Sequence, residues 1–157
     1  MRGMKRTKAH PFMSKSIEET KQGAQEILSK LPLDQNEAVV FSLSGNLGSG
    51  KTAFAKEFGS LLGIKKEEIT SPTFVIEKIY AISHLFFSHF IHIDAYRLES
   101  AEELLHLGWE EIVKNKKNII FIEWGERVSK ILPPSAKTIQ FRFIDEETRE
   151  ITFENIV

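Results

Sequence analysis

Segments of helical periodicity alternate with short apolar runs along this chain of 157 residues. Ser16 and Glu19 form a capping box, and apolar side chains then recur at helical spacing until Pro32, so a helix is predicted between Ser16 and Pro32. A second amphipathic segment covers residues 52–62 and stops at Gly63, a residue typical of helix ends. Both helices have one apolar face and therefore need a partner layer.

Short apolar and β-branched runs predict six strands, at residues 38–44, 74–82, 85–94, 118–123, 138–144 and 150–156. The second and third of these runs are separated by a short polar turn and predict a hairpin, and the last two predict a closing antiparallel pair. Ser100 and Glu103 form another capping box before a shorter helical segment. This mixture predicts an α/β domain of three layers around a mixed, partly antiparallel sheet.

The composition is that of an ordinary globular domain, with 41% hydrophobic and 27% charged residues. The absence of Cys excludes a disulfide scaffold, a thiolate metal site and a cysteine nucleophile. It is compatible with the reducing cytoplasm, where we expect the protein. No apolar run approaches the roughly 20 residues of a membrane span, and none follows the basic N-terminus, so we expect neither a span nor a secretory signal.

Basic residues gather at the beginning of the chain. Residues 1–15 carry five of the 21 Lys and Arg side chains and no acid, whereas the whole chain has a net charge of −1. We expect residues 1–13 to be a disordered basic arm and residues 14–157 to form a single domain. Such an arm can contact RNA phosphates, although a solvated tail is the simpler interpretation.

Eight residues after the strand predicted at 38–44 fit the phosphate-binding pattern G-x-x-x-x-G-K-[ST]: Gly45, Asn46, Leu47, Gly48, Ser49, Gly50, Lys51 and Thr52. The glycines allow backbone angles that turn successive N–H groups inward, and the N-terminus of the following helix favours a polyanion. Lys51 can reach the β- and γ-phosphates, and the Thr52 hydroxyl can bind Mg²⁺. The strand before the loop and the helix after it supply the context of a P-loop NTPase-like domain.

Two acids stand at the ends of apolar strands, Asp94 after residues 90–93 and Glu123 after residues 119–122. In parallel α/β sheets ligands bind at the carboxyl ends of the strands, so both acids are candidates for the metal or for the attacking water. The strand period places His92 on the same face as Asp94, where it either orients Asp94 or is merely structural.

Two other functions are compatible with a phosphate loop in a chain of this size. A small-molecule or nucleoside kinase is one, but such kinases usually need an Arg-rich lid, and the segment 108–118 is short and rich in Lys. A non-catalytic nucleotide-dependent binding module is the other, and the two strand-end acids argue against it.

The motifs together resemble the TsaE family, small P-loop ATPases of threonylcarbamoyladenosine biosynthesis. The resemblance runs from about Ser16 to the end of the chain. It rests on Glu18–Thr20, the phosphate loop, Ser71-Pro72-Thr73-Phe74, His92-Ile93-Asp94-Ala95-Tyr96-Arg97-Leu98 and Glu123-Trp124. Asn46 and Ser49 stand where the family often has Asp and Ala, a change that keeps the spacing of the loop.

The resemblance implies a role for each matching residue. Thr52 and Glu123 would hold Mg²⁺, and Lys51, Asp94 and Glu123 would carry catalysis. The nucleotide would contact the whole loop from Gly45 to Thr52. Further nucleotide contacts are implied for Thr20 near the base, Thr73 as a sensor of the γ-phosphate, Trp124, Glu126, and Arg149 in the last hairpin.

The resemblance also implies partners and a pathway. The chain would bind ATP and Mg²⁺, act with TsaB and TsaD, and hydrolyse ATP to support modification of the adenosine beside the anticodon in tRNA. Contact with tRNA would be indirect, through that complex. The chain alone would be a weak ATPase.

Overall fold

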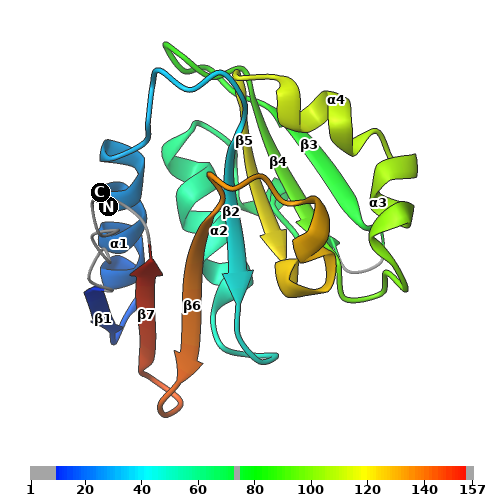
Figure 1. Cartoon of the computed structure of the whole chain (residues 1–157). Helices are drawn as coiled ribbons and strands as arrows, with labels where there is room; N and C mark the ends of the chain where they lie inside the picture. The colour runs from blue at the N-terminus through cyan, green and yellow to red at the C-terminus, as the bar shows by residue number, and fades with distance from the viewer. Residues whose placement is uncertain (1–9, 73–74, 155–157) are drawn as a thin grey trace, which may run out of the picture.

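The computed structural model describes residues 10–72 and 75–154. In chain order these residues form β1 (His10–Ser14), α1 (Ile17–Ser29), β2 (Val39–Ser44), α2 (Lys51–Leu61), η1 (Lys66–Glu68), β3 (Glu77–Ala81), β4 (His89–Asp94), α3 (Ala101–His106), α4 (Trp109–Lys114), β5 (Asn118–Glu123), η3 (Gly125–Ile131), β6 (Lys137–Phe143) and β7 (Arg149–Glu154) (Figure 1).

The strands form one seven-stranded sheet in the order β1-β7-β6-β2-β5-β4-β3. The four central strands β6, β2, β5 and β4 run parallel, whereas β3 at one edge and β7 and β1 at the other are antiparallel to their neighbours. The predicted mixed sheet, its two hairpins and its buried central strands are therefore confirmed. All the parallel strands point their carboxyl ends toward the lower edge of the sheet in Figure 1.

Helices cover both faces of the sheet, and each face has its own hydrophobic cluster. α1 and α2 pack over a cluster rich in phenylalanine, with Phe41, Phe54, Phe58, Phe90 and Phe121 all 0–1% exposed. On the opposite face α3, α4 and η3 cover a mainly aliphatic cluster that also contains Trp109. The three-layer α/β class predicted from the sequence is confirmed.

The first predicted capping box forms as expected. The Ser16 hydroxyl accepts a hydrogen bond from the Glu19 amide at 3.1 Å, and the Glu19 carboxylate accepts one from the Lys15 amide at 2.6 Å. The second box does not close: Ser100 is the N-cap of α3, but its side chain makes no capping bond. The helix start was therefore correctly predicted at both serines, although only the first uses its side chain.

The structure differs from the expected basic arm at residues 10–13. These residues belong to β1, which pairs antiparallel with β7, and the Phe12 ring packs against the phenylalanine-rich cluster above Gly23 of α1. The boundary drawn after residue 13 therefore lies inside a strand, because an apolar side chain and a free sheet edge favour pairing. Within the part of the chain that is described, no helix has the length and apolarity needed to cross a membrane.

Candidate functional site

The glycine-rich loop joins the end of β2 to the start of α2. Gly45 has a φ of +149° and Gly50 a φ of +105°, both in the region that favours glycine. A Cβ at Gly45 would lie 2.5 Å from the carbonyl oxygen of Phe141 in β6, so the loop passes close against the neighbouring strand. Glycine is therefore required here for both conformation and space, which fixes the path of the loop.

The loop delivers Lys51 into a buried position at the first turn of α2. The Lys51 ammonium donates to the Gly45 carbonyl at 2.5 Å and lies 4.2 Å from the centroid of the Trp124 ring. Burial lowers the pKa of Lys51, while the charges of Glu123, Asp94 and Glu126 act in the opposite direction. A lysine held inside the protein among carboxylates, beside a helix N-terminus, is an arrangement suited to a polyanion.

The two strand-end acids lie side by side. Asp94 of β4 and Glu123 of β5 are direct partners in the parallel register, and each is only 4% exposed. The Asp94 carboxylate accepts a hydrogen bond from the Tyr96 amide at 2.9 Å. Buried carboxylates need compensating charge or hydrogen bonds, and the Lys51 ammonium supplies part of that charge.

One cavity of about 340 Å³ joins the phosphate loop to these acids. Most of the residues that the sequence selected meet there: Leu47, Gly48, Gly50, Lys51, Thr52, Asp94, Glu123, Trp124 and Arg149. Ser71, the first residue of the motif that contains Thr73, also lines this cavity. Residues distant in the sequence therefore share one space at the carboxyl ends of the parallel strands.

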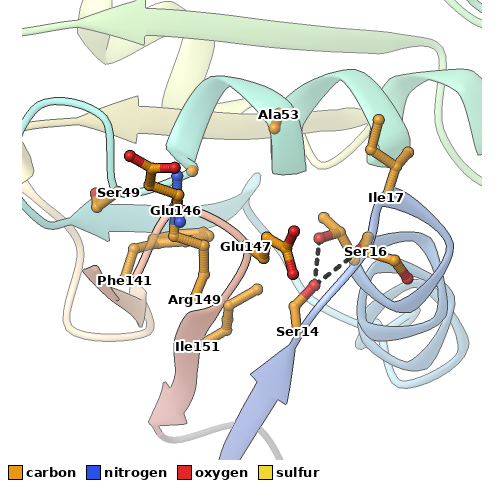
Figure 2. Close-up of a pocket in the computed structure, with 12 residues that line it drawn as sticks. Ser14, Ser16, Ile17, Ser49, Ala53, Phe141, Glu146, Glu147, Arg149 and Ile151 are labelled. Atoms are coloured by element: carbon orange, nitrogen blue, oxygen red, sulfur yellow. Dashed lines mark hydrogen bonds between the residues drawn. The ribbon is translucent and has the colours of Figure 1, made fainter. Parts of the chain in front are cut away.

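A second cavity, of about 230 Å³, lies beside the same loop and is shown in Figure 2. Thr20 and Arg149 both line it, together with Ser49 and Gly50 of the loop. The Arg149 guanidinium donates to the backbone carbonyls of Asp145 and Thr148 at 2.5 and 3.1 Å. Because Gly50 and Arg149 line both cavities, the two cavities are neighbours at the phosphate loop.

Several residues that line this second cavity were not predicted from the sequence. Ser14 borders it from the end of β1, and Ser16 and Ile17 from the start of α1. Phe141, Glu146 and Glu147 border it from the β6–β7 hairpin (Figure 2). The only signal was their closeness in sequence to Thr20 and to Arg149. Pairing of β1 with β7 brings these two segments together, and no local pattern reveals that pairing.

The other predicted nucleotide contacts are Trp124, Glu126 and Thr73, and the two that the structure describes differ in where they lie relative to the cavity at the phosphate loop. Trp124 adopts a left-handed backbone conformation with φ +60°, which is strained for a residue other than glycine. Glu126 accepts a hydrogen bond from the Ser44 hydroxyl at 3.3 Å and does not line the phosphate-side cavity, although its charge acts on Lys51. Thr73 lies outside the described residues.

Of the two roles left open for His92, the structure does not support orientation of Asp94. Its Nε2 lies 2.8 Å from Oε2 of Glu123, and the ring is fully buried. The strand period placed His92 and Asp94 on one face as predicted, but the parallel register of β4 and β5 turns the imidazole toward the neighbouring strand.

The residues present fit a nucleotide with Mg²⁺. The Ser49 hydroxyl is buried without a hydrogen-bond partner among the described residues, and the first amides of α2 have no partners within the helix. In the part of the chain described, no three or more His, Asp or Glu side chains are grouped as a metal site of their own. Mg²⁺ needs only one or two protein oxygens when phosphates supply others, and Thr52 and Glu123 line the same cavity.

Comparison of this chain with known proteins finds a family model and several related proteins whose descriptions name the same pathway. A family model described as Threonylcarbamoyl adenosine biosynthesis protein TsaE matches residues 14–151. A tRNA threonylcarbamoyladenosine biosynthesis protein TsaE from Treponema pallidum (strain Nichols) is 41% identical over 116 residues, which are 74% of this chain and 82% of that protein. A protein of the same name from Rickettsia bellii (strain RML369-C) is 34% identical over 140 residues, covering 89% and 91% of the two chains.

Among solved structures, the crystal structure of Bacillus subtilis YdiB superposes with a TM-score of 0.68 and 29% sequence identity. The superposition covers 96% of this chain and 87% of that one. The range matched by the family model contains the phosphate loop, both strand-end acids and Arg149.

Proposed function

The chain belongs to the TsaE family of threonylcarbamoyladenosine biosynthesis proteins, and from this premise we propose that it binds ATP with Mg²⁺ and hydrolyses it. In this proposal hydrolysis supports the threonylcarbamoyladenosine modification of tRNA, at the adenosine beside the anticodon, through a complex of TsaB and TsaD. We place this work in the cytoplasm.

One observation carries the proposal. A buried lysine, two buried carboxylates on adjacent parallel strands and a glycine-rich loop surround a single cavity at the start of a helix. A triphosphate matches this cavity because the amides and Lys51 neutralise its charge, and the acids provide a metal ligand on the opposite wall. The contiguous second cavity, beside Thr20 and Arg149, is of a size and lining suited to the nucleoside.

Each residue then has a defined task. Lys51 would contact the β- and γ-phosphates, Thr52 and Glu123 would hold Mg²⁺, and Asp94 would orient the attacking water or a water bound to the metal. Mg²⁺, when bound, neutralises charge that develops on the phosphate oxygens. Trp124 covers Lys51 and limits the access of bulk water to the phosphates, which strengthens electrostatic interactions there.

We propose that hydrolysis is slow until TsaB and TsaD are bound. The Arg149 guanidinium, which reaches both cavities, is held by carbonyls of its own hairpin and by the Phe143 ring at 4.6 Å. An arginine committed in this way does not neutralise transition-state charge at the γ-phosphate. Partner proteins that release it or supply another cation would complete the site.

Trp124 fluorescence tests the proposal directly, because this indole lies beside Lys51. The protein is titrated with ATP, ADP and GTP, with and without Mg²⁺, and then with TsaB and TsaD. Trp109 gives the background signal, since it is buried on the other face of the sheet, and a Trp109→Phe variant removes it. Saturable binding of ATP and faster hydrolysis with the partners are expected.

Two results would contradict the proposal. If no nucleotide changes the fluorescence or gives a calorimetric signal, the phosphate site is wrong. If nucleotides bind but TsaB and TsaD neither bind nor change the rate, the ATP site stands and the pathway assignment fails. Faster phosphorylation of a small acceptor than of water would instead favour a kinase.

A further inference from the structure

His92 is a buried polar residue that none of the tasks above uses. It lies on β4, on the same face as Phe90 and Asp94, and it has no exposed surface. In the parallel register it stands opposite Phe121 of β5, one strand repeat before Glu123. Its ring is 6.3 Å from Phe90 at an interplanar angle of 29°, so the imidazole separates the phenylalanine-rich core from the strand-end acids.

The direction of its hydrogen bond follows from the partner. Nε2 of His92 lies 2.8 Å from Oε2 of Glu123, and a carboxylate that binds a metal only accepts hydrogen bonds, so in the proposed site Nε2 carries the proton and donates. The other ring nitrogen, Nδ1, is buried and has no partner among the described residues. A buried polar atom without a hydrogen bond lowers the stability of a fold by about 1–3 kcal/mol. An apolar side chain at position 92 would avoid this cost, so packing alone does not explain the histidine.

We propose that His92 is a positioning residue for the metal ligand Glu123. The imidazole holds Oε2, so that Oε1 would remain for Mg²⁺ in the cavity that Glu123 lines. Without this bond the glutamate side chain has several rotamers, only some of which present an oxygen to the metal. Hydrogen-bond partners of metal ligands are typically worth 10–100-fold in metal affinity. This inference rests on the proposed nucleotide and Mg²⁺ site.

Three variants at position 92 separate positioning from packing. His92→Leu fills part of the space without a donor. His92→Gln places an amide N–H at about the reach of Nε2, whereas His92→Asn places it nearer to Nδ1 and too far from Glu123. His89→Leu is the matched control, because His89 begins the same strand and contacts Ser88 instead of an acid.

The readouts are metal and nucleotide binding by the full chain, independent of turnover. Mn²⁺ binding in the presence of ADP is followed by electron paramagnetic resonance, and ADP binding is followed by calorimetry with EDTA and with Mg²⁺. We expect His92→Leu and His92→Asn to bind Mn²⁺ about 10–100-fold more weakly, with metal-free ADP affinity changed less than about threefold. His92→Gln should recover most of the metal affinity, and His89→Leu should match the wild type.

Different failures have different meanings. Unchanged Mn²⁺ affinity in His92→Leu overturns the positioning role and leaves the nucleotide site intact. An equal loss of metal-free ADP binding in all three position-92 variants shows a packing role and also overturns it. If His92→Leu does not fold, the Mn²⁺ affinities of His92→Gln and His92→Asn are compared. Equal affinities in these two variants overturn the positioning role. Absence of ADP and Mn²⁺ binding in the wild type refutes the proposed function itself.

Discussion

The two faces of the strands β4 and β5 differ in chemistry although they share one backbone. On the face covered by α2 the side chains change from aromatic to ionisable toward the carboxyl ends: Phe90, His92 and Asp94 on β4, and Phe121 and Glu123 on β5. On the face covered by α3, α4 and η3 each strand begins with a polar residue, His89 on β4 and Asn118 on β5, and is aliphatic toward its carboxyl end: Ile91 and Ile93 on β4, and Ile120 and Ile122 on β5.

The difference shows where a buried charge is tolerated in this protein. On the face toward α2, Lys51 and the first amides of α2 lie close to the strand ends. A carboxylate on the opposite face would meet Val128 and other apolar side chains, with no partner to offset its desolvation. The face toward α2 therefore contains both part of the hydrophobic core and the ionisable residues of the site. At these strand ends the opposite face contributes to the hydrophobic core alone.

The largest effect is expected from Phe121→Ala, in the aromatic part of the functional face. The Phe121 ring contacts four other phenylalanines, with centroids at 4.6–6.1 Å. Its removal should cost about 3–5 kcal/mol of unfolding free energy, measured by urea denaturation. Exposed Phe86 is the control, since Phe86→Ala should change stability by less than about 0.5 kcal/mol. A loss below about 1 kcal/mol at Phe121 would mean that this cluster is not the main core.

Glu123→Gln tests the ionisable end of the same face. The amide keeps the shape of the side chain and removes its charge, so ATP hydrolysis with TsaB and TsaD should fall about 100-fold, equivalent to about 2.7 kcal/mol. Binding of ADP in EDTA should persist. Glu111→Gln on exposed α4 is the matched control. Turnover at the wild-type rate in Glu123→Gln would remove Glu123 from the metal site.

Ile122→Val tests the aliphatic face next to Glu123. Loss of one buried methylene should lower the unfolding free energy by about 0.5–1.5 kcal/mol. Hydrolysis and Mn²⁺ affinity should stay within about twofold of the wild type, because the side chain points away from the cavity. If Ile122→Val is fully folded but hydrolyses ATP much more slowly than the wild type, packing on the aliphatic face affects the site on the opposite face.

The smallest effect concerns pH. Burial lowers the pKa of Lys51 below its ordinary value of 10.5, so the free protein loses this charge at a lower pH than an exposed lysine would. A bound polyanion favours the charged form. ADP affinity should therefore be constant below the lowered pKa and fall a few-fold as pH rises through it, measured by calorimetry. A Lys51→Arg variant that still binds should lack this fall, and an identical fall would assign it to another group.

Much of the site was visible in the sequence because its signals are local. The phosphate loop is eight consecutive residues between a strand and a helix, and Asp94 and Glu123 each end an apolar run. The strand period also placed Asp94 on the same face as His92. These features depend on neighbours within a few positions, as do the capping box at Ser16 and the two hairpins, so a linear pattern was sufficient to predict them.

Pairing between distant segments was decided only by the tertiary structure. The register of β4 against β5 makes Glu123, and not Asp94, the hydrogen-bond partner of His92. The pairing of β1 with β7 places Thr20 and Arg149 at one cavity. It also converted residues 10–13 from an expected arm into a sheet edge. Sheet hydrogen bonds join backbone groups that every residue possesses, so the choice of strand neighbour depends on how both helical layers pack, which no short segment encodes.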